Sequence, residues 1–243
     1  MRKSIYKITD GETQMKEGLL IKACWALYKR PIISELPILG VKNPAEVFKK
    51  AQQLYKSEMN RLPDYSQYDV LKLNLAHAVM LGAIYESCPE KPDINALTKF
   101  YHDFILKPKI VRLAFSKAKM LSPSNIRRQV KIGETSQYAT HPFTWQFKVK
   151  VEDKSRFTAD FTRCGIYDYL SSRGLGHIVP AMCALDYTFG EIGNHWFLRE
   201  STIATGGKIC DCHYVDKTVA TREEIERSKR NRREEAMRGG RAF

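Results

Sequence analysis

The sequence lacks any hydrophobic run that could cross a membrane, because none of its apolar stretches approaches the ~20 residues that a spanning helix needs. The most apolar stretch, residues 18–27, is interrupted by Lys22 and flanked by Lys16 and Lys29. The first fourteen residues begin with basic side chains, but no apolar segment follows them, so no signal peptide is expected. These absences predict a cytoplasmic protein with no membrane partner.

Acidic residues are scarce relative to basic ones. Lys and Arg total 40 and Asp and Glu total 27, which gives a formal net charge of +13. Such a charge favours anionic partners, and a small anionic substrate is the one expected here. Residues 107–131 hold eight basic side chains and no acidic one. No recognition motif accompanies them, so nucleic acid is not expected, whereas a homo-oligomer remains open.

The familiar signatures of catalysis and metal binding are also missing. The chain has no H-E-x-x-H, G-x-S-x-G, P-loop or G-x-G-x-x-G motif. Its six cysteines are too sparse for a disulfide scaffold and are expected to be thiols in the cytoplasm. The paired C-x-x-C spacing of structural zinc sites is absent as well. We therefore predict no metal and no cofactor.

What the sequence does contain is enough apolar material to fold, with 43% hydrophobic and 11% aromatic residues. Residues 1–125 show helical periodicity throughout. Pro31 is expected to end the first helix, and Pro108 is expected to break the fourth. The helices are predicted at 18–28, 44–55, 68–87, 93–106 and 110–120.

Past residue 140 the hydrophobic period changes from helical to alternating. Residues 145–151 and 157–162 alternate apolar with polar side chains and form a predicted hairpin. Two helices follow, one after Cys164 and a longer one over 177–192. The last two strands, 196–202 and 208–215, are expected to flank a hairpin turn at Gly206-Gly207.

This order of elements predicts an α+β fold, in which N-terminal helices pack with a C-terminal antiparallel sheet of about four strands and two helices. We divide the chain into a helical region (1–125), a sheet region (140–220) and a basic helical tail (221–243). The helical and sheet regions are expected to form one compact domain.

The tail has almost no apolar residues to bury, and so little burial cannot offset the cost of ordering some twenty residues. Truncation after Thr221 is therefore expected to leave the fold and turnover nearly intact. The alternative is that Ile225 and its neighbours form a helix that covers a pocket or pairs subunits.

Four of the six cysteines fall within 49 residues, at Cys164, Cys183, Cys210 and Cys212. On a strand, Cys210 and Cys212 share one face with Cα atoms about 6.6 Å apart, which is awkward for a disulfide. The pair is therefore interpreted as free thiols, metal ligands or packed side chains. Each cysteine taken alone is equally explained as a small buried hydrophobe.

Asp186 is harder to explain as packing. It lies three residues after Cys183, on the same face of a predicted helix that is otherwise apolar. A carboxylate in that position needs a partner or has a function. A salt bridge to Arg163 and a catalytic role are equally compatible with the sequence.

The segment 160–215 resembles the L-2-amino-thiazoline-4-carboxylic acid hydrolase family. The matching residues are Thr162-Arg163-Cys164, Cys183-Ala184-Leu185-Asp186-Tyr187, Thr202, Gly206-Gly207 and Cys210-Asp211. Two positions depart from the family pattern. Gly165 replaces a common proline, and Cys212 replaces an aromatic residue.

The resemblance implies a hydrolase acting on carbon–nitrogen or carbon–sulfur bonds of a small cyclic amidine. Its implied catalytic residues are Cys164, Cys183 and Asp186, with either thiol attacking as a thiolate if Arg163 lowers its pKa. Asp186 would hold the amidinium or serve as a base, and Arg163 or Arg199 would bind the substrate carboxylate. The remaining implied substrate contacts are Thr202, Tyr187 and Cys210.

A more distant likeness gives a competing function. The glycine turn followed by a cysteine-containing strand is similar to four-vinyl-reductase and haem-nitric-oxide-binding domains. That likeness implies a non-catalytic sensor or scaffold for a small hydrophobic or metal-containing ligand. Its binding site would be lined by Tyr187, Phe189, Trp196 and Phe197.

Overall fold

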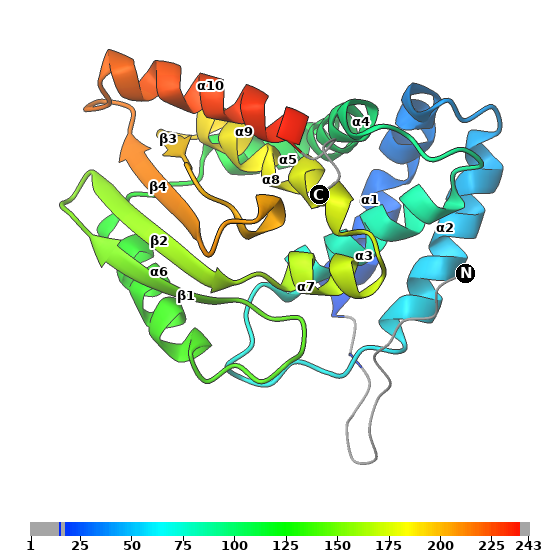
Figure 1. The fold of residues 1–243 in the computed structure, drawn as a ribbon, viewed down its shortest axis with the longest axis horizontal. Helices are drawn as coiled ribbons and strands as arrows, with labels where there is room; N and C mark the ends of the chain where they lie inside the picture. Colours follow the sequence, from blue (N-terminus) through cyan, green and yellow to red (C-terminus); the bar gives the residue numbers. More distant parts are fainter. Residues whose placement is uncertain (1–14, 16–17, 239–243) are drawn as a thin grey trace.

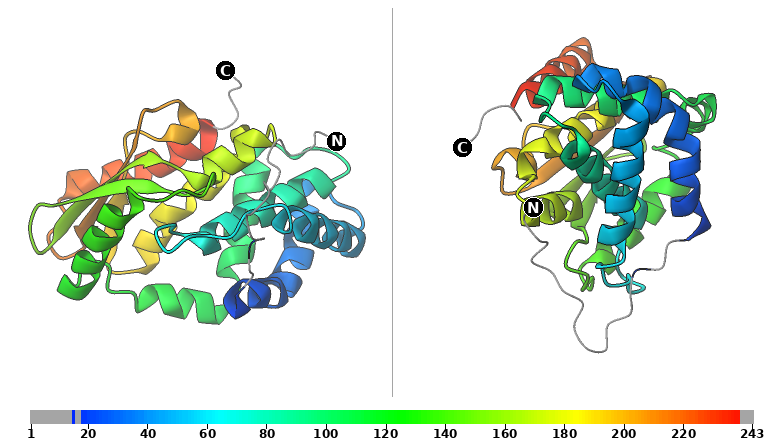
Figure 2. Two further views of the ribbon diagram at one scale, coloured as in Figure 1. Left: turned by 90° about the horizontal axis from the view of Figure 1, so that it is seen from below. Right: turned by 90° about the vertical axis from the view of Figure 1, so that its right-hand side faces the viewer.

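The computed structural model describes residue 15 and residues 18–238. An antiparallel sheet lies at one end of the molecule and a bundle of helices at the other (Figures 1 and 2). The predicted α+β fold is confirmed. The first fourteen residues, for which no signal peptide is expected, lie outside the described part. Among the described helices, none is both long enough and apolar enough to span a membrane.

The helix bundle follows the predicted periodicity, with one correction. Asp93 caps its last helix by accepting from the backbone N–H groups of Asn95 (2.8 Å) and Ala96 (3.0 Å). The prediction that Pro31 ends the first helix is wrong, because continuing the helix buries Ile32 and Leu36 completely. The elements are α1 (Leu19–Glu35), η1 (Leu36–Leu39), α2 (Pro44–Met59), α3 (Lys72–Ser87) and α4 (Ile94–Leu106).

Two further helices connect the bundle to the sheet. The expected break at Pro108 is present, and the short α5 (Lys109–Ser116) follows it. The next helix, α6 (Pro123–Ser136), was not predicted, although Ser122 caps it by accepting from the N–H of Asn125 (3.3 Å). Helix α6 lies against β1 (Gln146–Val151), as Figure 1 shows. Three cations of the basic stretch, Arg127, Arg128 and Lys131, line a groove of ≈ 510 Å³.

The strands form one sheet of four in the described part of the chain, in the order β1-β2-β4-β3. The hairpin of β1 and β2 (Arg156–Arg163) is as predicted. Strand β4 (Cys210–Asp216) pairs with β2 and with β3 (His195–Leu198). The predicted two-residue hairpin at Gly206-Gly207 is wrong, because β3 ends at Leu198 and a longer loop containing η3 (Ile203–Thr205) leads to β4.

One face of this sheet is apolar and carries the two strand cysteines. Cys210 is paired with Phe161 and Cys212 with Ala159, and both thiols are buried. The Phe157 and Tyr214 rings of neighbouring strands stack with centroids 4.5 Å apart. The expectation that Cys210 and Cys212 share a face is thus confirmed.

The helices between β2 and β3 bring the family motif to the sheet. Helix α7 (Gly165–Ser172) begins directly after Cys164. The single helix predicted over 177–192 is wrong, because Pro180 and a break at Ala184 divide it. The pieces are η2 (Gly176–Ile178), α8 (Val179–Cys183) and α9 (Leu185–Ile192).

The last described helix, α10 (Arg222–Arg238), runs along the edge strand β3 (Figure 1). An edge strand has unpaired backbone groups that invite association with other chains. On α10, the Ser228 hydroxyl donates to the carbonyl of Phe197 (2.6 Å). The Asn231 amide, one turn later, donates to the carbonyl of Arg199 (2.5 Å). Side chains of α10 therefore donate to backbone carbonyls at this side of the sheet, where no further strand pairs in the described part of the chain.

The expectation of a solvated tail is contradicted over 222–238. Ser228, Asn231 and Glu235 are buried although they are polar, because each has a hydrogen-bonding partner in the domain. The helix also begins with a capping box, in which Thr221 and Glu224 bond each other's backbone N–H groups at 2.7 and 3.2 Å. Buried, hydrogen-bonded polar side chains hold this helix against the rest of the protein. A count of apolar residues does not reveal them.

Removal of residues 222–243 is now expected to destabilise the protein. It should lower the free energy of unfolding by about 3 kcal/mol or more, since a buried charge on Arg199 loses its partner Glu235. Urea unfolding followed by circular dichroism measures the change. A truncated protein as stable as the full chain would restore the solvated-tail expectation.

A matched pair of substitutions tests the edge contact by itself. Asn231→Ala removes the donor to the edge strand and should cost about 1–2 kcal/mol. Arg230→Ala, the exposed neighbour on the same helix, should change stability by less than about 0.5 kcal/mol. Equal effects of the two substitutions would contradict the contact.

Candidate active site

The structure brings the dispersed motif residues to one place between the sheet and the helices. Cys164 follows β2, Cys183 ends α8, and Asp186 lies in the first turn of α9. Arg199 follows β3, and Cys210 begins β4. The Cys183 thiol is close enough to Arg199 and to the thiols of Cys164 and Cys210 for their charges to affect its ionisation. We call these five residues the thiol–carboxylate cluster.

Arg199 is the centre of this cluster, and its side chain is only 4% exposed. Its Nη1 donates to the Asp186 carboxylate (2.9 Å), and its Nη2 donates to the backbone carbonyl of Cys183 (3.0 Å). Its Nη2 and Nε both donate to Glu235, at 2.7–3.3 Å. The Cys212 sulfur lies 3.9 Å from Nη1. With its donors so occupied, Arg199 is poorly placed to bind a substrate carboxylate.

Asp186 combines two properties that are rarely found together. Surrounding protein raises the pKa of its carboxyl group, although the adjacent Arg199 charge opposes that rise. Nevertheless, 47% of its side chain is accessible to solvent. An accessible carboxyl group with a raised pKa is suited to proton exchange with a small molecule.

The thiols of Cys164 and Cys183 are protonated at neutral pH. Burial raises the pKa of Cys164 to about 12 and the pKa of Cys183 well above its usual value. The N–H groups of Ile166 and Tyr167, in the first turn of α7, oppose the rise at Cys164 because they bond its sulfur. Both residues are only partly buried.

Arg163 does not provide the activation expected of it. Its Nε donates to Asp168 (3.1 Å), and its Nη2 donates to the carbonyl of Pro142 (2.5 Å). Its side chain remains 32% exposed. Asp186 does form the salt bridge considered as the alternative to catalysis, but its partner is Arg199 and not Arg163.

Thr202 and Cys210 hold the loop beside the cluster. The Cys210 thiol donates to the Thr202 hydroxyl (3.5 Å) and accepts from the N–H of Ile203 (3.2 Å). Asp211, the next residue, accepts from the N–H of Ser201 (2.6 Å). Because Thr202 and Cys210 are buried and bonded to each other, they shape this loop.

The family model for L-2-amino-thiazoline-4-carboxylic acid hydrolase matches residues 74–214, which is more than half of the chain. The chain belongs to this family. The match runs from α3 to β4 and includes the whole thiol–carboxylate cluster, but it ends before α10. No curated protein and no solved structure shows significant similarity to the chain.

Close packing explains why glycine replaces proline after the T-R-C motif in this member of the hydrolase family. A Cβ atom at Gly165 would lie 2.4 Å from the carbonyl oxygen of Phe143 and 2.8 Å from the Trp145 ring. Proline and every other residue would meet the same obstacle. The other departure, Cys212, places a sulfur atom against Arg199.

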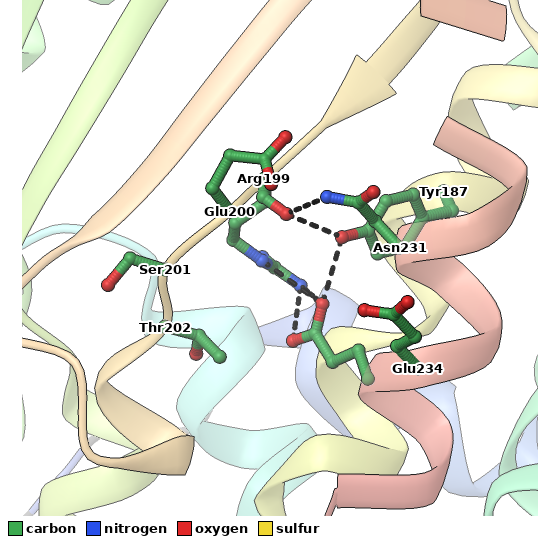
Figure 3. Close-up of a pocket in the computed structure, with 8 residues that line it drawn as sticks. Tyr187, Arg199, Glu200, Ser201, Thr202, Asn231 and Glu234 are labelled. Carbon is green, nitrogen blue, oxygen red and sulfur yellow. Dashed lines mark hydrogen bonds and ion pairs between the residues drawn. The ribbon is translucent and has the colours of Figure 1, made fainter. Parts of the chain in front are cut away.

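A pocket lies between Arg199 and α10 (Figure 3). It measures ≈ 10 Å³, which holds about one water molecule and no thiazoline. Its lining includes Tyr187 and Thr202, two of the predicted substrate contacts. This pocket is therefore too small to be the site where the substrate binds.

The aromatic residues expected to line a ligand site belong largely to the core. Tyr187 and Phe197 are each 1% exposed and pack edge to face, with ring centroids 5.0 Å apart. Phe189 stacks on Phe115 at 3.6 Å. Among the described residues, no three His, Cys, Asp or Glu side chains are grouped as a metal site.

Sequence reasoning missed Glu235, the residue most closely bonded to Arg199. Two signals in the sequence point to it. The capping box at Thr221 and Glu224 marks the start of a helix. Ser228, Asn231 and Glu235 then follow at helical spacing as a polar stripe.

Alkylation by iodoacetamide should reveal the raised pKa of Cys164. Between pH 7 and pH 10 its rate should rise about tenfold per pH unit, because the reactive thiolate fraction grows by that factor below the pKa. Peptide mass spectrometry measures the modification of each cysteine separately. A plateau near pH 9, as for an ordinary thiol, would contradict the burial of this sulfur.

Substitution of Gly165 tests whether packing accounts for its departure from the family pattern. Gly165→Ala should destabilise the protein by about 1–3 kcal/mol, because its Cβ would overlap Phe143. At Gly18 an added Cβ meets nothing within 4 Å, so Gly18→Ala serves as the control. Thermal unfolding of both variants measures the difference.

Proposed function

We propose that the protein is a hydrolase that opens a small cyclic amidine of the 2-amino-thiazoline carboxylate type. Membership in the hydrolase family supports the reaction class. The observation that carries the proposal is the accessible Asp186 carboxyl group, held by a buried arginine beside the partly buried residues Cys164 and Cys183. Carboxyl and thiol groups are the ones that such a ring opening requires.

The chemistry of the family's namesake substrate defines the reaction that the protein would have to catalyse. Carbon C2 of the thiazoline is bonded to the ring sulfur, the ring nitrogen and an exocyclic amine. Protonation of this isothiourea makes C2 electrophilic. Addition of water and cleavage of the C2–S bond give carbamoyl-cysteine.

We assign the nucleophile to Cys164. Its neutral thiol transfers a proton to the basic ring nitrogen, which produces a thiolate beside an electrophilic amidinium. The N–H groups of Ile166 and Tyr167 stabilise that thiolate. The thiolate adds to C2, and the ring sulfur then leaves and takes up a proton. Cys164 remains joined to C2 as an isothiourea.

Asp186 acts in both steps of this reaction. As a carboxylate it accepts hydrogen bonds from the amidinium and balances its charge. In the second step it takes a proton from water, whose oxygen adds to C2. Asp186 then passes this proton to the departing Cys164 sulfur, which leaves as a thiol, and the urea group of the product is formed. Cys183 lies beside the reacting groups.

Arg163 is our candidate for the substrate carboxylate. Of the two arginines considered, Arg199 has its donors occupied by protein groups, whereas Arg163 is 32% exposed. A guanidinium group can bind a carboxylate through two parallel hydrogen bonds. This binding would favour acidic thiazolines over neutral ones.

Turnover of 2-amino-thiazoline-4-carboxylate, followed by mass spectrometry of carbamoyl-cysteine, tests the proposal. Asp186→Asn and Cys164→Ser should each lower kcat/KM by about 100-fold or more, since each removes a reacting group. Cys24→Ala changes a buried cysteine of the helix bundle and should leave turnover within a few-fold. Thermal melts of all variants separate lost chemistry from lost fold.

Two results would contradict the assignment. Wild-type turnover no faster than the buffer rate would exclude this substrate. If the purified protein then carried a bound chromophore or metal, the non-catalytic ligand-binding function would replace the hydrolase. Persistent turnover in Cys164→Ser, by contrast, would transfer the attack to Cys183 or directly to water.

A further inference from the structure

One buried cation in this protein is shared by two carboxylates. Asp186 lies 2.9 Å from Nη1 of Arg199, and Glu235 lies 2.7 and 2.8 Å from Nη2. A guanidinium carries one positive charge and keeps it at every physiological pH. If both carboxylates are ionised, the group therefore carries one excess negative charge inside the protein.

The two carboxylates differ in burial and in the number of bonds that hold them. Glu235 is 5% exposed and also accepts a hydrogen bond from the Tyr187 hydroxyl (3.0 Å). Asp186 is 47% exposed and accepts one hydrogen bond from the guanidinium. Glu235 is thus fixed as the partner of the arginine, while Asp186 faces an accessible side of the cluster.

We propose that Glu235 is a positioning residue, a resident counter-ion of Arg199 that leaves Asp186 free to exchange a proton with a bound substrate. This inference rests on the proposed function, in which Asp186 is the acid–base group. Because the Arg199–Glu235 pair is neutral, ionisation of Asp186 adds net charge to the protein interior, which favours the protonated form. Glu235 acts through Arg199 and touches no substrate.

The other groups around Asp186 are compatible with this assignment. Apart from Arg199 and Glu235, the titratable groups that interact electrostatically with Asp186 carry no formal charge at neutral pH. They are Tyr101 of α4, Cys212 and Tyr214 of β4, and the neighbouring Tyr187. The charge balance at Asp186 thus depends on the arginine and on the second carboxylate.

The position of Glu235 in the chain adds to its interest. Glu235 lies on α10, outside the segment that matches the hydrolase family, whereas its partners Arg199 and Tyr187 lie inside that segment. Ser228, two turns before Glu235, fixes the helix to Phe197 of β3, and Asn231, one turn before it, fixes the helix to Arg199, which follows β3. The edge contact thereby determines where this carboxylate is placed.

Carbon-13 NMR of the aspartate carboxyl groups tests the inference without any substrate. Asp186 is assigned from the resonance that disappears in Asp186→Asn. In the wild-type protein it should titrate above the ordinary aspartate pKa of about 3.9. In Glu235→Gln it should titrate at least about one unit lower, a tenfold change in the protonated-to-ionised ratio, because Arg199 is left with one counter-ion.

Glu226→Gln is the matched control. It makes the same chemical change on the same helix, but Glu226 is exposed and pairs with Lys229. Its Asp186 titration should equal that of the wild type. Glu235→Asp keeps the charge and should also stay near the wild-type value.

The outcomes distinguish this inference from the proposed function. An unchanged Asp186 titration in Glu235→Gln, or an equal shift in Glu235→Asp, would overturn the counter-ion assignment, whatever the turnover. If Glu235→Gln does not fold, a wild-type Asp186 pKa at or below about 3.9 overturns it instead. The predicted shift without any thiazoline turnover would refute the proposed substrate and keep the counter-ion.

Where turnover is present, the pH–rate profile gives a second readout. The limb that reports ionisation of Asp186 should move to lower pH in Glu235→Gln and stay in place in Glu226→Gln. A purely structural role for Glu235 would lower the rate at every pH without moving this limb.

Discussion

The buried charge of Arg199 is the constraint on which the arrangement of the site depends. A guanidinium cannot lose its charge, and an unpaired buried charge would cost several kcal/mol. Its bonding groups come from the end of α8, from α9, from α10 and from β4. These elements are held in one relative arrangement because each contributes an acceptor to the same side chain.

The same constraint links stability to chemistry. A cluster composed of thiols and carboxyl groups alone would repel itself when ionised, and burial raises the pKa of such groups. One fixed positive charge allows two carboxylates to approach closely. The accessible one, Asp186, keeps a raised pKa.

Alternation along the chain was sufficient to predict the sheet. The side chains of 145–151 and 157–162 alternate because one face of the hairpin covers a core and the other meets water, so the two strands and their hairpin could be inferred. The shared face of Cys210 and Cys212 followed from the same two-residue period. The convergence of Cys164, Cys183 and Asp186 was implied by family resemblance, since spacing alone does not bring separate elements together.

The missed features have a common physical cause. Pro31 lies within a helix whose burial outweighs one lost hydrogen bond, and α10 is fixed by hydrogen bonds between polar groups. In both cases a tertiary contact overrides the local preference of the chain. Glu235 could not be recognised from composition, because a glutamate in a highly charged helix resembles its exposed neighbours.

The contact between α10 and β3 also has a consequence for biosynthesis. On the ribosome, all four strands are made before α10 emerges. Until it docks, the carbonyl of Phe197 on the outer edge of the sheet lacks the hydrogen bond from Ser228. A nascent chain at that stage offers neighbouring chains a template for strand pairing, and prompt docking of α10 removes it.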